Sequence, residues 1–281
     1  MGTFGIADNS SLSPSRYVAP STESIACTDL IIGYDKSRPV FPEINLRVRP
    51  TEFIILTGRN GTGKSTLLRT IAGLQPPVSG IVKVNDRLLS GYSQNEKAKL
   101  IGFVSTEKID VADMTVFELV AMGKYARTGW LGKLADKDKH DVIEAIGTVG
   151  MAHSANRKTS ELSDGELQRA SIARTLAQDT SIIILDEPTA FLDLPNSAEI
   201  ILLLRNLAKN KNKTILLSTH DLSMAMQSAD RICLLSCNGM IQGAPRFFAE
   251  NKLLDELFRN SQVKYNYSTF SVEFINPYSH K

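Results

Sequence analysis

A glycine-rich stretch carries the clearest chemical pattern in this sequence. GRNGTGKST, from Gly58 to Thr66, fits the pattern G-x-x-x-x-G-K-[ST]. Glycines let such a loop turn tightly, so that successive backbone N–H groups face a polyphosphate. Lys64 would then reach the β- and γ-phosphates, and the Ser65 hydroxyl would bind Mg²⁺. The alternative is a glycine-rich turn with a chance lysine. The candidate nucleotide-binding residues are Gly58, Arg59, Asn60, Gly61, Thr62, Gly63, Lys64, Ser65 and Thr66.

Acidic and imidazole groups follow two other apolar runs. SIIILDEP ends in adjacent carboxylates, of which Asp186 suits the Mg²⁺ shell of a nucleotide site. Glu187 could orient or deprotonate the attacking water, which would make it catalytic. A solvated strand end would explain the same pair without any function. His220 follows the run TILLST and is either an ordinary polar terminus or a further group at the same site.

These side chains need strands that deliver them to one place. EFIILT (52–57) predicts a buried strand, and Lys64 to Leu74 has helical spacing until QPPVSG ends it. Further strands are predicted at 100–106, 181–185, 214–219 and 231–236, with helices at 165–177, 197–209 and 222–228. This alternation favours an α/β fold with a mainly parallel sheet covered on both faces. Because the carboxyl ends of parallel strands line one crevice, we expect Gly58, Asp186 and His220 to lie at one edge.

Other segments divide the chain. Residues 1–22 are rich in Ser and Pro and predict a flexible tail. Residues 27–34, 41–48 and 81–89 predict strands, those before residue 52 in a separate small sheet, whereas 115–160 look mostly helical. Residues 263–267 and 270–274 predict two short strands joined by a turn or bulge. We therefore expect a tail at 1–22, one domain at 23–250 with a helical insert at about 107–164, and a C-terminal extension at 251–281.

Composition limits the partners. The 32 basic and 30 acidic residues leave a net charge of +2, which gives no electrostatic reason to expect nucleic acid. The three cysteines form no metal-ligand pattern, so free thiols in a reducing, cytoplasmic compartment are expected. Apolar runs are far shorter than the ~20 residues that cross a bilayer, so any membrane association is expected to come through a partner.

One helix start mixes acidic residues with a serine. In ELSDGELQRA (161–170), Ser163 and Glu166 have the spacing of a capping box, in which each side chain accepts from the backbone N–H of the other residue. That pattern is fully explained by helix capping.

With these motifs in place, residues of about 24–250 resemble the ATP-binding-cassette (ABC) ATPase family. LSDGE (162–166) is similar to the family signature, usually Leu-Ser-Gly-Gly-Gln, and TAFLD (189–193) is similar to its D-loop. The resemblance implies a P-loop NTPase (RecA-like) core with an antiparallel β subdomain and a helical insert subdomain. It also implies ATP and Mg²⁺ as cofactors, and a head-to-tail homodimer in which Ser163 and Gly165 of one subunit bind the γ-phosphate held by Lys64 of the other.

The resemblance assigns two further residues and meets two departures. It makes His220 the switch histidine and places Tyr34 where an aromatic ring stacks on adenine, although a core or edge-strand Tyr is the alternative. Thr106 stands where the family has a Gln that contacts Mg²⁺. Asp164 and Glu166 replace Gly and Gln in the signature, and we expect Glu166 to cap the helix while Ser163 and Gly165 keep the phosphate role.

Within the family, residues 115–134 are similar to the insert of importers for iron chelates, haem and cobalamin. The implied protein is an ATP-hydrolysing importer subunit, bound through permease subunits to the cytoplasmic face of the cell membrane and served indirectly by a substrate-binding protein. Met122, Tyr125 and Trp130 would contribute to the permease contact, unless the insert packs only on itself. An exporter subunit, a soluble ABC ATPase and a non-hydrolytic regulatory binder are the alternatives.

Overall fold

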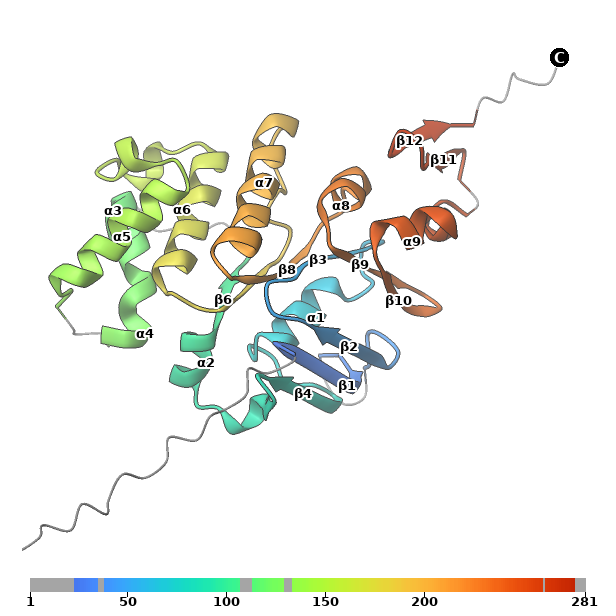
Figure 1. Ribbon diagram of the computed structural model, residues 1–281, viewed down its shortest axis with the longest axis horizontal. Coiled ribbons are helices and arrows are strands. Elements are labelled where there is room, and N and C mark those ends of the chain that lie inside the picture. Colours follow the sequence, from blue (N-terminus) through green and yellow to red (C-terminus); the bar gives the residue numbers. More distant parts are fainter. Residues whose placement is uncertain (1–22, 35–37, 107–112, 129–132, 260, 276–281) are drawn as a thin grey trace, which may run out of the picture.

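The computed structural model describes residues 23–34, 38–106, 113–128, 133–259 and 261–275. The predicted tail at 1–22 and the predicted contact residue Trp130 lie outside the described residues. Figure 1 shows a central sheet with an antiparallel sheet on one side and a group of helices on the other. No helix of the described segments has the length and apolar character that a bilayer span requires.

The central sheet has six strands in the order β10-β9-β3-β8-β7-β6. Strands β3, β6, β7, β8 and β9 run parallel to one another, and the edge strand β10 pairs antiparallel with β9. Runs such as IIIL are apolar at every position because both faces of a parallel sheet are covered. The predicted mainly parallel sheet is confirmed. Strand bounds are β3 Phe53–Gly58, β6 Ile101–Val104, β7 Ile182–Leu185, β8 Thr214–Ser218, β9 Arg231–Ser236 and β10 Gly239–Gly243.

The second sheet is antiparallel, with the order β2-β1-β4-β5. Its strands are β1 Ile25–Ile31, β2 Ile44–Val48, β4 Ser79–Val84 and β5 Arg87–Leu88. The prediction of one strand over 81–89 is wrong, because Asn85 and Asp86 have φ angles of 48° and 63° and turn the chain back on itself. Asn and Asp tolerate this left-handed conformation better than most residues, so the turn was encoded locally.

Helices cover the central sheet in two groups. On the face shared with the antiparallel sheet, α1 (Lys64–Ile71) packs Leu67 and Leu68 against Ile54 and Leu56 of β3. On the opposite face, Phe53 and Ile55 contact a second apolar cluster that draws on most of the other helices. These are α3 Val116–Ala121, α5 Asp136–Thr148, α6 Asp164–Ala177, α7 Leu194–Asn210, α8 Leu222–Ser228 and α9 Pro245–Glu250. The short helices α2 (Gln94–Leu100) and α4 (Tyr125–Thr128) complete the set.

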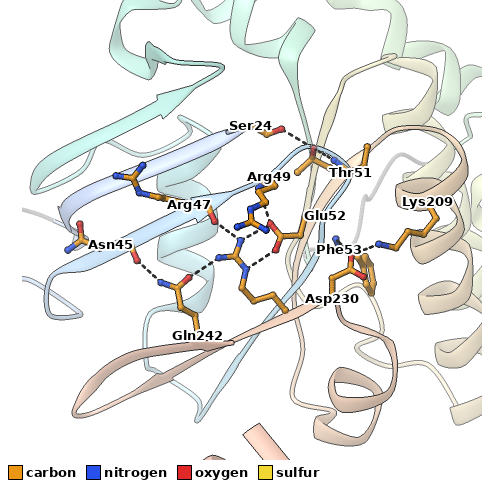
Figure 2. A network of polar contacts seen from close by, with 12 residues as sticks. Ser24, Asn45, Arg47, Arg49, Thr51, Glu52, Phe53, Lys209, Asp230 and Gln242 are labelled. Carbon is orange, nitrogen blue, oxygen red and sulfur yellow. Dashed lines mark hydrogen bonds and ion pairs between the residues drawn. The ribbon is translucent and has the colours of Figure 1, made fainter. Parts of the chain in front are cut away.

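A polar network joins the two sheets at the end of β3 remote from the glycine-rich loop (Figure 2). Arg231 of β9 binds both Glu52 oxygens, at 2.8 and 2.6 Å, and also donates to the Arg47 carbonyl of β2. Asp230 accepts from the Phe53 N–H at 2.9 Å and from Lys209 of α7 at 2.6 Å. Each strongly polar group is therefore paired, which avoids the cost of leaving a part-buried charge unsatisfied and fixes the sheets relative to each other.

The last described residues form a short helix, a 3₁₀ segment (Leu253–Phe258) and a hairpin of β11 (Val263–Asn266) and β12 (Ser271–Phe274). The hairpin confirms the two short predicted strands. Tyr265 and Tyr267 hold it in place: the Tyr267 hydroxyl accepts from the Leu254 N–H at 2.9 Å, and the Tyr265 ring joins the apolar cluster under α8.

Candidate nucleotide-binding and hydrolysis site

The glycine-rich loop joins β3 to α1, as the sequence predicts. Gly58 has a φ of 149°, and a Cβ there would lie 2.4 Å from the Leu235 carbonyl oxygen of β9. Gly63 has a φ of 95° and packs against Ile32 and Val40, so a side chain at either glycine would disrupt the loop. The N-terminus of α1 and the open loop before it therefore present backbone N–H groups to an anion.

Lys64 is nearly buried beneath this loop. Its Nζ donates to the carbonyl oxygens of Gly58 at 3.0 Å and Arg59 at 3.1 Å. Burial lowers its pKa, while the nearby carboxylates of Glu187 and Asp186 act in the opposite direction. The hydrogen-bond partners of the ammonium group are neutral carbonyls, so an anionic ligand would be a stronger acceptor in their place. Arg59, Asn60 and Gly61 are exposed at the loop tip, and the Thr62 hydroxyl donates to the Arg59 carbonyl at 2.9 Å.

Asp186 lies beside the start of α1. Its Oδ1 accepts from the Ser65 hydroxyl at 3.0 Å and from the Ser218 hydroxyl at 2.8 Å, and the side chain is 2% exposed. Ser65 Oγ and Asp186 Oδ1 are hard oxygen donors of the kind Mg²⁺ prefers, so these two residues fit the predicted metal. Among the described residues, no group of three or more His, Cys, Asp and Glu side chains could hold a metal by itself.

Glu187 and His220 form the second pair at this edge. His220 Nε2 lies 2.5 Å from Glu187 Oε1, and both side chains are partly exposed. Glu187 has a φ of 48°, an uncommon conformation for a residue with a side chain, and its N–H donates to Ser218 Oγ at 2.8 Å. A cavity of about 340 Å³ opens next to Glu187 and His220, lined also by Thr189, Ala190, Leu192 and Thr219.

Ser218 is the residue that the sequence interpretation missed. Its hydroxyl donates to Asp186 and accepts from the Glu187 N–H, so one fully buried side chain links the metal-binding and catalytic candidates. Within the run TILLST it looks like part of an apolar strand. Its position directly before Thr219 and His220, at the carboxyl end of β8, is the only sequence signal that could have identified it.

Thr106 also contacts this region. Its hydroxyl donates to the Asp186 carbonyl oxygen at 2.8 Å, so it links the ends of β6 and β7. That hydroxyl is thereby used by the backbone, and the Asp186 carboxylate is supported by the two serines instead.

The serine and glycine of the LSDGE motif lie elsewhere. Ser163 is the N-cap of α6, and Glu166 completes a capping box, which confirms the expected capping role of Glu166. Gly165 faces Asn196 and Leu192 at the start of α7. Figure 1 shows α6 and α1 well apart, and they pack on opposite faces of the sheet. Within one chain, the structure therefore brings Gly58, Lys64, Ser65, Asp186, Glu187 and His220 together but leaves Ser163 and Gly165 apart from them.

Tyr34 follows β1 and is 77% exposed, so the alternative that it belongs to the core is wrong. It lies two residues beyond Ile32, which packs on Gly63 at the start of α1. Tyr34 is therefore close in sequence to a residue that packs on the glycine-rich loop, and its ring is exposed to solvent.

A buried strand, a glycine-rich loop with a buried lysine, and an aspartate that binds the loop serine together define a P-loop nucleoside triphosphatase. Residues 41–190 match the ABC transporter family. The ABC transporter ATP-binding protein MJ0873 of Methanocaldococcus jannaschii is 36% identical over 239 residues, covering 85% of this chain and 82% of the relative. The petrobactin import ATP-binding protein FpuD of Bacillus anthracis is 36% identical, covering 78% and 81%. The ferric enterobactin transport ATP-binding protein FepC of Escherichia coli is 34% identical, covering 84% and 89%. The chain belongs to the ABC transporter family of ATP-binding proteins, and it is an ATPase of that class.

Solved structures give the same result. A metal-chelate type ABC transporter in an inward-facing conformation superposes with a TM-score of 0.74 at 28% identity, covering 90% of this chain and 96% of that one. A dimeric bacterial ABC transporter cassette, MJ0796, superposes with a TM-score of 0.69 at 27% identity, covering 79% and 99%. The expected RecA-like core with an antiparallel β subdomain and helical segments is confirmed.

Proposed function

We propose that this chain is the ATP-hydrolysing subunit of an importer for an iron chelate, acting as a homodimer on permease subunits at the cytoplasmic face of the cell membrane. The observation that carries the hydrolytic part is the close pairing of Glu187 with His220, beside the Ser65–Asp186 pair and the Lys64 loop. The cargo class rests on FpuD and FepC, which are named for petrobactin import and ferric enterobactin transport.

In the proposed reaction, the loop from Gly58 to Thr66 binds the phosphates of ATP. Lys64 leaves its carbonyl partners to pair with the β- and γ-phosphates, since a phosphate neutralises its charge better than two dipoles do. Ser65 and Asp186 would hold Mg²⁺, which supplies charge neutralisation on the phosphates. Glu187 accepts a proton from the attacking water, and His220 orients the Glu187 carboxylate. Tyr34 stacks on the adenine ring.

The dimer part of the proposal rests on the incomplete site. Ser163 and Gly165 lie on the face of the sheet opposite α1, so they cannot complete the phosphate site of their own chain in this arrangement. A second copy placed head to tail would supply them. The solved cassette with a similar fold is described as dimeric, which supports this assembly.

The permease part rests on the helical insert. α3, α5 and α6 pack together around Val116, Leu119 and Val142, in the apolar cluster that also covers one face of the central sheet. Tyr125 nevertheless leaves 43% of its side chain exposed, and Met122 is only partly buried. We propose this surface and the strand end at Thr106 as the permease contact. The import function named for FpuD supports the choice of an importer over an exporter.

The experiment has a biochemical and a cellular arm. Purified protein should release phosphate from ATP, and Glu187→Gln should reduce turnover by about 10²- to 10⁴-fold while ATP-dependent dimers persist in light scattering. Glu144→Gln, on the exposed side of α5, is the matched control and should keep turnover. In cells expressing the permease, uptake of a radiolabelled iron chelate should require Glu187. Higher cellular accumulation in the Glu187 variant would indicate an exporter, and turnover with no effect on either flux would indicate a soluble ATPase.

A further inference from the structure

An arginine outside the family motifs contacts the acidic signature. Arg157 Nη1 donates to Glu166 Oε1 at 2.7 Å and to Ser154 Oγ at 3.3 Å, while its Nη2 donates to the Glu161 carbonyl at 2.7 Å. The guanidinium is therefore fixed by three acceptors, and the Arg157–Glu166 pair is about two-thirds buried on both sides. A guanidinium group held in this way positions the carboxylate that it binds and also neutralises its charge.

Glu166, held by Arg157, in turn binds Ser163. Its second oxygen, Oε2, accepts from the Ser163 N–H at 2.9 Å and from the Ser163 hydroxyl at 3.0 Å. Ser163 Oγ in turn accepts from the Glu166 N–H at 3.3 Å. Because a hydroxyl has a single proton, Ser163 points that proton at Glu166 in this state. The direction of the serine hydroxyl thus depends on where Glu166 is held.

The charge balance gives Arg157 a second role. The first turn of α6 carries Asp164 and Glu166, at the end of a helix that would otherwise attract phosphate. An approaching γ-phosphate would be repelled by an uncompensated Glu166 carboxylate. Arg157 supplies the compensating positive charge on the Oε1 side, away from Ser163.

The backbone of Arg157 belongs to the helical insert. Its carbonyl accepts from the Val116 N–H at 3.0 Å, at the first residue of α3, and the neighbouring Thr159 N–H donates to the Met114 carbonyl at 2.8 Å. The position of the guanidinium is consequently tied to the start of α3 rather than to α6 alone.

The same local arrangement occurs a second time in the chain. Arg87 binds Glu96 Oε1 at 3.0 Å and donates to the Gly91 carbonyl, and Ser93 and Glu96 form the capping box of α2. The Arg, the residue whose carbonyl accepts, the Ser and the Glu have the same spacing in both places. Their positions are 87, 91, 93 and 96 at α2, and 157, 161, 163 and 166 at α6. An Arg thus binds the Glu of a capping box at two places in this chain. The arrangement at α2 provides an internal control for the arrangement at the signature.

We propose that Arg157 is a positioning residue for ATP binding across the dimer, which neutralises and orients Glu166 so that the acidic signature accepts the γ-phosphate at Ser163. This inference rests on the proposed function, in which Ser163 contacts the nucleotide of the partner subunit. It explains how a signature with Glu in place of Gln remains compatible with a phosphate ligand.

The test is charge rescue. Arg157→Gln should raise the KM for ATP by about tenfold with a smaller effect on kcat, the size expected for losing one directly contacting charge pair. Glu166→Gln provides the reference KM for the double variant. The double variant Arg157→Gln/Glu166→Gln should return to within about twofold of Glu166→Gln, because no carboxylate remains to repel phosphate. Arg157→Lys, which keeps the charge, should lie close to the wild type, and Arg87→Gln should not change the KM.

Hydrogen exchange of the nucleotide-free protein provides a readout that does not need activity. Arg157→Gln should accelerate exchange of the Ser163 and Glu166 amides, and Arg87→Gln should do so only at the start of α2. Unchanged exchange at Ser163 in Arg157→Gln would overturn the positioning role. A double variant as impaired as Arg157→Gln would overturn the charge role, since a purely structural arginine is not rescued by neutralising Glu166. Absence of turnover and dimerisation in the wild type would overturn the proposed function itself, and this inference with it.

Discussion

Removing the Ser218 hydroxyl tests whether the site is held together as the geometry indicates. Ser218 is fully buried and bridges Asp186 Oδ1 and the Glu187 N–H, each at 2.8 Å. In Ser218→Ala, Asp186 keeps the Ser65 hydroxyl, but the Glu187 N–H loses the acceptor that holds it in a left-handed backbone conformation. We expect the carboxylate of Glu187 to lose its alignment with the attacking water.

The size of the effect follows from those two bonds. A buried polar group left without its partner costs about 1–3 kcal/mol, and for a chain of this length each kcal/mol lowers Tm by about 2–4 °C. Ser218→Ala should therefore lower Tm by several degrees. Misplacement of a catalytic group by about 1 Å can cost up to about 10²-fold in rate, so we expect kcat to fall at least about tenfold with little change in KM.

Ser236→Ala is the matched control for this experiment. Ser236 is also a buried serine of the central sheet, and its hydroxyl likewise donates to one group, the Gly239 carbonyl, and accepts from another, the Asn238 N–H. The two variants should lose similar thermal stability in calorimetry, but only Ser218→Ala should lose turnover in a phosphate-release assay. Equal kcat values for the two variants at equal loss of Tm would refute the role assigned to Ser218.

Three other predictions follow from the described contacts. The Asp186→Asn variant should need a higher Mg²⁺ concentration for half-maximal turnover, measured by titration after chelator treatment, and an unchanged requirement would exclude Asp186 from the metal shell. The Arg59 guanidinium donates to the Leu257 carbonyl at 3.2 and 2.6 Å, so Arg59→Ala should speed proteolysis of the C-terminal extension about fivefold, and equal cleavage rates would contradict this contact's role. The Ser163 N–H, and then Arg157, hold the pKa of Glu166 below its ordinary value of 4.5, so its stabilising contribution is present above that pH and lost as the pH falls through the lowered pKa. Tm measured between pH 7 and pH 3 should accordingly fall less in Glu166→Gln than in the wild type, and parallel curves would contradict it.

The phosphate loop was predictable because its structure is local. The glycine spacing, Lys64 and the preceding apolar strand all lie within a short stretch, and the conformation of Gly58 and Gly63 follows from their lack of a side chain. The parallel sheet was predictable for a related reason, since strands covered on both faces are apolar at every position.

Elements with few buried residues were missed. Helix α2 has no buried residue, so its sequence shows no periodic spacing of apolar residues. The Ser93–Glu96 capping box nevertheless marks its start. Strand β10 is a partly exposed edge between two glycines, and α9 is marked only by Pro245 in its first turn. The helix predicted to begin at 197 starts at Leu194, because Asp193 caps it and Pro195 is compatible with the first turn. For α2 and α7 the local signal was a side-chain cap rather than an apolar period.

The long-range contacts of the site could not be predicted from spacing. Ser218 lies 31 residues from Glu187 in the chain, and the bond between them exists only because β7 and β8 are neighbours in the sheet. Arg157 precedes Glu166 by nine residues, and its backbone is held by α3, which lies some forty residues earlier. Sequence patterns identify the groups that carry the chemistry, whereas the groups that position them depend on tertiary pairing.

In the proposed dimer, the phosphate contacts of one site come from opposite faces of the sheet in two chains. Asp186 and Glu187 follow β7, and Lys64 follows β3 through the glycine-rich loop; because β3 and β7 both pair with β8, the geometry of the three groups is fixed within a chain. Ser163 is attached through Glu166 and Arg157 to the insert, whose helices α3 and α5 pack in the apolar cluster on the sheet face opposite α1. The phosphate contacts of a nucleotide bound between two such chains would therefore depend on where the insert of one chain lies relative to the sheet of the other. In the proposed dimer, ATP would favour the relative placement of sheet and insert that gives the better phosphate contacts, and its binding energy would thereby act on whatever the insert contacts.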